Sequence, residues 1–181
     1  MHTTDAHTQG NGAMLGLPRQ ALRALGATLY RELGGGAAGP LQEAGYGAGL
    51  YDAFARWMAE RHGTTPDQIG AERFPTELAR FFADLGWGSL TFGTMGTVAT
   101  LDSSDWAEGN PAHPMEFPAC YFTAGLLTEL FMRLSDVPVS ALEVECRSAG
   151  AERCRFLVGS SETIQRVYDG LSAGVGYEAN V

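Results

Sequence analysis

The sequence predicts a single α+β domain, with helices packed on a small antiparallel sheet. Apolar residues recur at helical spacing in much of segment 17–85, whereas later segments alternate between apolar and polar residues as strands do. The composition agrees, because 181 residues with 45% hydrophobic and 18% charged side chains suffice for one core and are too few for two ordinary domains. We expect residues 1–13 to form a flexible arm and residues 14–181 to form the domain.

Three helices are predicted in the first half of the chain. Apolar residues recur at helical spacing over residues 17–33, with Pro18 near the start, and the glycine-rich segment 34–40 ends this first helix. The second helix is predicted to end at about Arg61, with an apolar stripe in its second half. The third covers residues 75–85, where leucine and phenylalanine form an inward face.

Three glycines, Gly45, Gly47 and Gly49, weaken the first half of the second predicted helix. Two interpretations stay open for them. The helix either tolerates them within a packed interface, or they let another backbone or a ligand approach closely.

The period changes after the third helix. Residues 87–102 alternate and predict two strands around Gly93–Gly96, and the following segment 103–118 is rich in proline, glycine, asparagine and serine, which is typical of a loop. A strong amphipathic helix is then predicted over residues 118–135.

The C-terminal part predicts a hairpin and a last helix. Residues 139–146 and 153–159 alternate as strands and are joined by a short turn that contains glycine. Ser160 or Ser161 is expected to cap the final helix, because a serine hydroxyl accepts a hydrogen bond from the first free backbone amides.

Charge excludes several partners. The formal net charge is −9, and all 12 basic residues are arginines scattered along an acidic chain, which disfavours nucleic acid and anionic membrane surfaces. No stretch approaches the roughly 18–20 apolar residues that span a bilayer. The first residues also lack the pattern of a secretory signal. We therefore expect a cytoplasmic protein without a membrane span.

Signatures of catalysis are missing from the sequence. We find no Ser-His-Asp order, no paired-carboxylate spacing and no G-x-G-x-x-G followed by an acidic residue. The absence of lysine removes a Schiff-base or Walker-type residue, and no segment predicts a binding site for a hydride donor. These observations favour a binding protein over an enzyme.

Three cysteines and a glutamate form the candidate functional cluster. An odd number of cysteines weakens a disulfide framework, and clustered cysteines in a reducing compartment are more often metal ligands or redox thiols. Cys146 and Cys154 lie on the two arms of the predicted hairpin. Cys120 starts a helix, where the helix dipole favours the thiolate form that binds metals.

Glu143 would complete this cluster only if its strand is irregular. It precedes Cys146 by three positions, so strict alternation places the two side chains on opposite faces, and a bulge would be needed to bring them together. Three thiolates and one carboxylate would give the closed tetrahedral shell of a structural zinc site. The alternative is three buried free thiols and an exposed glutamate.

Segment 117–160 resembles the C-terminal signature of the 4-vinyl reductase domain family. In that signature a cysteine opens an aromatic, glycine-containing helix, which is followed by E-x-x-C, a turn with glycine, and C-x-F. These parts correspond here to Cys120, Gly125, Glu143, Cys146, Gly150, Cys154 and Phe156.

This resemblance implies a mixed α/β fold related to subunits of the Golgi vesicle-tethering particle, usually as a homodimer. It implies a structural zinc ion bound by Cys120, Glu143, Cys146 and Cys154, which fixes the C-terminal hairpin. It further implies a small hydrophobic or aromatic ligand beside the zinc, as in phenol-responsive bacterial regulators. In this comparison the chain is a stand-alone member.

Two other functions follow from the same resemblance. A stand-alone member of bacteriochlorophyll biosynthesis suggests a bound tetrapyrrole, and an accessory or reductase role toward its 4-vinyl group. The tethering-particle subunits suggest a scaffold that works only through protein contacts.

Aromatic residues concentrate between residues 81 and 132 and give the candidate ligand pocket. The alternative is that they form an ordinary core. His113 lies in the predicted loop, where it either contacts a tetrapyrrole metal or a phenolic ligand, or is solvated. The candidate pocket residues are Phe82, Trp87, Phe92, Trp106, His113, Phe117, Tyr121 and Phe122.

Overall fold

The computed structural model describes residues 16–181, so the predicted arm over residues 1–13 lies outside the described part of the chain. The helices are α1 (Arg19–Leu33), α2 (Ala38–Tyr46), α3 (Leu50–His62), α4 (Phe74–Asp84), α5 (Tyr121–Leu134) and α6 (Ser161–Ser172). The strands are β1 (Thr91–Met95), β2 (Val98–Ser103), β3 (Val139–Glu145) and β4 (Cys154–Ser160). The predicted α+β class, with helices on a small antiparallel sheet, is confirmed.

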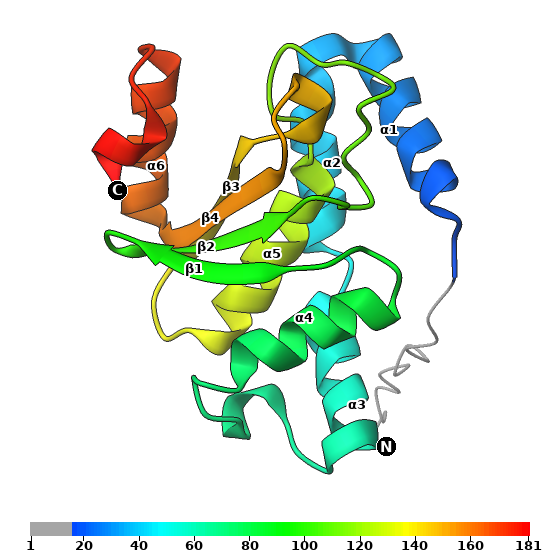
Figure 1. Cartoon of the computed structure of the whole chain (residues 1–181), viewed down its shortest axis with the longest axis vertical. Coiled ribbons are helices and arrows are strands. Elements are labelled where there is room, and N and C mark those ends of the chain that lie inside the picture. The colour runs from blue at the N-terminus through cyan, green and yellow to red at the C-terminus, as the bar shows by residue number, and fades with distance from the viewer. Residues whose placement is uncertain (1–15) are drawn as a thin grey trace, which may run out of the picture.

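The four strands form one antiparallel sheet in the order β1-β2-β4-β3. The two predicted hairpins therefore lie side by side, because β2 pairs with β4 although α5 separates them in sequence. In Figure 1, α3 and α4 lie below the sheet, while α6 rises above it. The sheet is thus covered on both faces.

Strand β4 shows why both faces are covered. Its side chains alternate, so that Phe156 and Val158 join the main core with the helices, while Leu157 joins a smaller core with Ile164 and Val167 of α6. The near-continuous apolar run of this strand follows from its central place between two packed layers.

The structure corrects the predicted second helix. It is two helices, α2 and α3, because Gly49 has φ 71° and ends the helical path in the left-handed region that glycine tolerates. Residues 38–40, which we predicted to end the first helix, already belong to α2. The last helix is capped as predicted, since the Ser160 hydroxyl accepts a hydrogen bond from the Thr163 amide at 3.2 Å.

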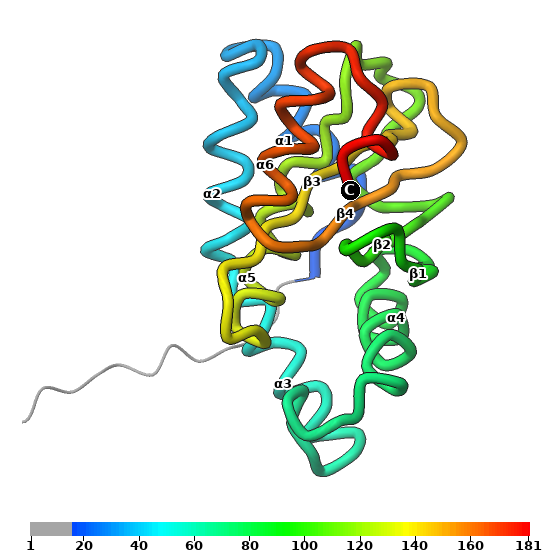
Figure 2. Tube along the Cα trace, turned by 90° about the vertical axis from the view of Figure 1, so that its left-hand side faces the viewer, coloured from blue at the N-terminus to red at the C-terminus, as the bar shows by residue number. Residues whose placement is uncertain are grey.

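Helices α2 and α5 touch through their backbones. A Cβ on Gly45 would lie 2.0 Å from the Phe122 carbonyl oxygen, and one on Gly125 would lie 2.1 Å from the Gln42 carbonyl oxygen. Figure 2 shows the two helices side by side. Of the two interpretations of Gly45, close approach of another backbone is therefore correct, and this contact fixes the start of α5 against α2.

A buried carboxylate joins α3 to α4. Glu77 is 3% exposed, and its oxygens lie 3.0 Å from His62 Nε2 and 3.2 Å from Arg80 Nη1, with Arg73 at 3.6 Å. Burial alone would raise the pKa of the Glu77 carboxyl, but the hydrogen bond from His62 and the neighbouring positive charges outweigh it and lower the pKa.

None of the helices described in residues 16–181 has the length and apolar character needed to cross a membrane.

The α2–α5 contact predicts a large effect of one methyl group. We expect Gly125→Ala to lower the free energy of unfolding by about 3 kcal/mol or more, because the new Cβ meets backbone atoms that cannot move independently. Gly39→Ala, also in a helix but with open space at its Cβ, should be neutral or stabilising by up to about 1 kcal/mol. Urea unfolding measures both, and equal effects would contradict the contact.

The Glu77 cluster predicts a defined pH dependence. Because its pKa is lowered in the folded state, the stability that Glu77 contributes is fully present above its ordinary value of 4.5 and is lost as the pH falls through the lower folded value. Glu77→Gln should cost about 1–3 kcal/mol at neutral pH, and this difference from the natural protein should shrink toward about pH 3. The exposed Glu72, replaced by Gln, is the control. A difference that is constant with pH would contradict the assignment.

Candidate metal centre and adjoining cavities

The four predicted metal ligands lie together in the structure. One ligand atom from each of Cys120, Glu143, Cys146 and Cys154 lies within 4.8 Å of every other. The Cys120 sulfur is 3.9 Å from both other sulfurs. All four residues are buried, with exposed fractions between 0% and 6%. The cluster that the sequence assembled only by spacing is therefore a real spatial group.

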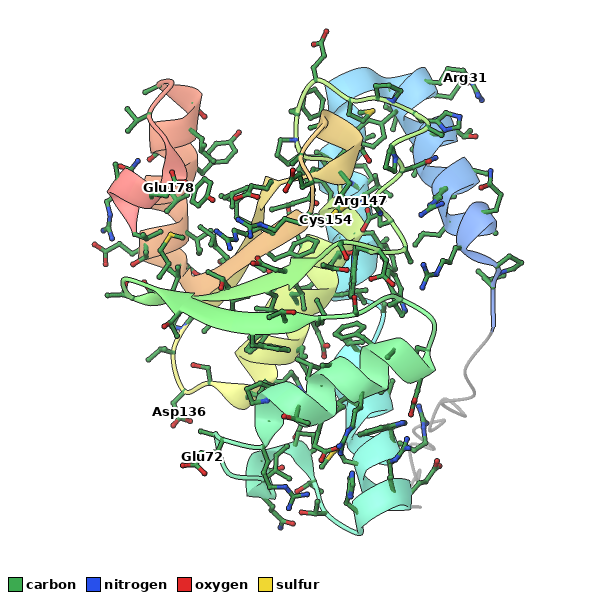
Figure 3. The ribbon with its side chains drawn as sticks, in the orientation of Figure 1. Arg31, Glu72, Asp136, Arg147, Cys154 and Glu178 are labelled. Carbon is green, nitrogen blue, oxygen red and sulfur yellow. The ribbon has the colours of Figure 1, made fainter. Side chains whose placement is uncertain are left out.

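Three secondary-structure elements supply these side chains. Cys120 is the N-cap of α5, Cys146 directly follows β3, and Cys154 begins β4. A short 3-10 turn, Arg147–Ala149, joins the strands, and Gly150 closes it with φ 87°. Figure 3 shows Cys154 next to Arg147, where β4 leaves this turn. The cluster thus joins the start of one helix to both arms of the hairpin.

A bulge brings Glu143 into the cluster. Glu143 pairs with Phe156 and Glu145 with Arg155, so two steps on β3 correspond to one step on β4. Val144 is the extra residue, and it changes the alternation that would otherwise place Glu143 opposite Cys146. The irregularity that the sequence required is confirmed.

The electrostatics of the cluster call for a cation. The carboxylate of Glu143 accepts a hydrogen bond from the Cys120 amide at 2.8 Å, but its other oxygen is buried without a hydrogen-bond partner among the described residues. Burial raises the pKa of the Glu143 carboxyl and of the Cys120 thiol, whereas hydrogen bonds from the other two thiols lower the pKa of Cys146. A bound metal ion would compensate the orphaned oxygen and the clustered thiolates.

The donor set itself is informative about the metal. Three sulfurs and one carboxylate oxygen fill all four positions of a tetrahedral shell, and thiolates select soft or borderline ions. This buried set of donors can hold a metal ion, and its closed shell leaves no position for a substrate.

Most of the predicted pocket aromatics pack against one another. The Trp106 ring centre lies 5.2 Å from that of Phe82 and 5.6 Å from that of Trp87, and Trp87 stacks on Phe122. Trp106 is fully buried, and its Nε1 donates to the Thr123 hydroxyl at 2.8 Å. These four aromatic residues belong to or pack against the main core, as does Phe92. None of the five lines either cavity described next.

The first cavity, of about 390 Å³, lies between α1 and the loop that follows Trp106. Its walls are mainly apolar, and the predicted His113 is among its lining residues. Ala119 and Ser148 also line it, and they neighbour Cys120 and Cys146 in sequence. This cavity, called the α1 cavity below, therefore adjoins the metal centre.

The second cavity, of about 730 Å³, runs along β3 between α5 and α6. The predicted Phe117 and Tyr121 line it, together with Tyr168 of α6 and Glu143. Because Glu143 faces this cavity and Ser148 faces the α1 cavity, the metal centre adjoins both.

Sequence reasoning missed Glu108, which lines the α1 cavity. Its Oε1 accepts from the Phe122 amide at 3.1 Å, and its Oε2 accepts from the amide and hydroxyl of Thr123 at 2.8 and 2.6 Å. Burial raises the pKa of Glu108 to about 7, although these hydrogen bonds act to lower it. Glu108 caps α5 from a distant loop, so no local sequence pattern marks it.

Helix α1 also contributes residues that the sequence did not single out. It buries no residue, and it is attached to the loop by hydrogen bonds from side chains to backbone carbonyls. Arg23 donates to Ala107 and Gly109, and Tyr30 donates to Ala119. Figure 1 shows α1 at the outer edge of the molecule beside this loop.

Comparison with known proteins supports the resemblance found in the sequence. Residues 110–160 match the family model of the vinyl 4-reductase domain. A comparison with curated protein sequences gave no match.

Three solved structures are similar to the chain. The phenol-responsive sensory domain of the transcription activator PoxR, with phenol, has a TM-score of 0.60 and 24% identity, over 82% of this chain and 77% of that one. A trafficking protein particle complex subunit 3 from Naegleria fowleri, covalently bound to palmitic acid, has a TM-score of 0.55 and 10% identity, over 78% and 91%. A vinyl-4-reductase family protein from Methanocaldococcus jannaschii has a TM-score of 0.46 and 17% identity, over 80% and 82%. The first two show that this chain shares their fold.

The geometry of the cluster predicts how its metal responds to mutation. Cys154→Ser and Glu143→Gln should each weaken metal binding by more than about 100-fold, beyond the loss typical of an outer hydrogen-bond partner. Each should also lower the melting temperature, because metal binding contributes to folding. Elemental analysis after dialysis and thermal melts measure both.

A matched control for these variants lies two residues along the same strand. Glu145 pairs with Arg153 instead of joining the cluster. Glu145→Gln should therefore leave the metal content unchanged. An unchanged metal content in Cys154→Ser would show that the metal lies elsewhere.

Proposed function

We propose that this protein is a small-molecule binding or sensing domain in which a structural zinc ion, held by Cys120, Glu143, Cys146 and Cys154, fixes the C-terminal hairpin. The observation that carries the proposal is the buried cluster of three cysteines and one glutamate, which lies between two cavities in the segment that matches the family model. The role of the ion is to hold shape, because all four of its positions are taken by protein ligands.

Zinc suits this site for a physical reason. The ion would cross-link the start of α5 to β3 and β4, and the free energy of its binding would add to that of folding. The loop over residues 107–119 leads directly into Cys120. A zinc ion that fixes Cys120 would therefore also fix one wall of the α1 cavity.

The cavities support a ligand of small or moderate size. Their volumes of about 390 and 730 Å³ fall in the range of roughly 300–1,000 Å³ that small-molecule sites occupy. The PoxR sensory domain, which shares this fold, was crystallised with phenol. We propose an apolar or aromatic molecule as the ligand class here.

Metal analysis and absorbance of the purified protein test the zinc proposal. We expect about one zinc per chain and no visible colour. A Soret-type band in protein without stoichiometric zinc would instead support a bound tetrapyrrole and contradict the proposal.

Thermal shift measurements test the binding function. Phenol and naphthalene, added separately at millimolar concentration, should raise the melting temperature of the zinc-loaded protein, because a ligand that binds only the folded state stabilises it. The shift should be lost after zinc is removed by a chelator. No shift with any apolar or aromatic compound in the zinc-loaded protein would favour a scaffold without a ligand.

A further inference from the structure

We infer that the α1 cavity binds a small carboxylic acid, with Arg23 as the partner of the carboxylate and the apolar walls around the rest of the molecule. The inference rests on the proposed small-molecule function and names the chemistry of the ligand. It comes from a cation that lines the cavity without an acidic partner among the described residues.

Arg23 is held in place but keeps free donors. Its Nε donates to the Ala107 carbonyl at 2.9 Å, and its Nη2 donates to the Gly109 carbonyl at 2.9 Å. A guanidinium carries five N–H donors, so the Nη1 amine and one N–H of Nη2 have no partner within residues 16–181. Arg23 takes part in none of the ion pairs found in that part of the chain.

The position of this charge makes it a binding group. Arg23 is partly buried and lines a cavity whose walls are mostly apolar. A cation in such surroundings gains much from a bound anion, because charge-assisted hydrogen bonds are strong where water is limited. The two carbonyl contacts orient the guanidinium in advance, so less conformational freedom is lost on binding.

A second donor lines the same cavity. The side-chain amide nitrogen of Asn110 lies 2.8 Å from His113 Nδ1, and an amide nitrogen can only donate. The neutral imidazole therefore carries its proton on Nε2. The backbone amide of Asn110 in turn donates to the Ser148 hydroxyl at 2.8 Å, which anchors this part of the loop to the turn after Cys146.

The acidic residue that lines the cavity does not compete for Arg23. Both oxygens of Glu108 accept hydrogen bonds from residues at the start of α5. The partial positive charge of the helix N-terminus balances this carboxylate. The charge of Arg23 is therefore left for a ligand.

Size and lining narrow the ligand class to a monocarboxylate with an apolar body. A volume of about 390 Å³ accommodates an aromatic or short-chain acid. The apolar walls come from α1, α2 and the loop, through Leu22, Ala27, Leu41, Met115 and Ala119. One arginine and one neutral imidazole match a single carboxylate, whereas a phosphate dianion would need more donors.

Calorimetry on the zinc-loaded full chain tests the inference with benzoate and benzamide. Benzamide has nearly the same shape as benzoate and no charge, so it separates the carboxylate from the apolar body. We expect benzoate to bind at least about tenfold more tightly. Equal affinities for the two probes, or no binding of benzoate, would overturn the inference.

Two arginine variants provide the matched comparison. Arg23→Gln should weaken benzoate binding by roughly tenfold to a hundredfold, the range for a charged hydrogen bond, and should leave benzamide binding nearly unchanged. Arg19→Gln is the control, because Arg19 also donates to loop carbonyls, those of Gly86 and Asp105, but does not line the cavity. An equal loss of benzoate binding in both variants would show a general effect on the loop and overturn the inference.

A second measurement is independent of the stability of the variants. In nuclear magnetic resonance spectra of the natural protein, benzoate should shift the side-chain Nε–H signal of Arg23, and benzamide should shift it much less. No shift at Arg23 on saturation with benzoate would overturn the inference. If phenol or naphthalene still stabilises the protein in that case, the proposed binding function stands and the ligand lacks a carboxylate.

Discussion

The metal cluster is the constraint on which the functional half of this molecule depends. Three thiols and a carboxylate are buried together, and one carboxylate oxygen has no hydrogen-bond partner in the described part of the chain. Such a group is stable only if a cation occupies its centre or if the donors stay protonated. Because its members come from α5, β3 and β4, one bound ion would fix the helix start, the hairpin and the loop between them.

A second constraint places that helix start. Gly45 and Gly125 let α2 and α5 meet backbone to backbone, so the beginning of α5 cannot move away from α2. The loop before α5 then has to cross between α1 and the hairpin, and Glu108 from this loop caps α5. The α1 cavity is the space left between a firmly fixed loop and a helix that buries no residue.

The aromatic residues illustrate how packing decides a role. Trp106 and Phe82 were candidates for a ligand pocket or for a core, and the structure packs both into the main core. Sequence pattern does not distinguish the two roles, because a cavity wall and a core contact require the same apolar side chains. Arg23 shows the converse, since a charged residue on an outer helix becomes part of a cavity only through the loop that lies against it.

The sequence alone determined the α+β class, the strands, the strong helix after residue 118 and the four members of the cluster. It also determined that Glu143 needs a bulge, because metal ligation restricts residue type and short spacing and strand alternation is a local rule. Only the tertiary structure decided the break at Gly49, the cap supplied by Glu108 and the meeting of Arg23 with His113 in one cavity. These features depend on the packing of elements far apart in the chain, which leaves no periodic or local trace in the sequence.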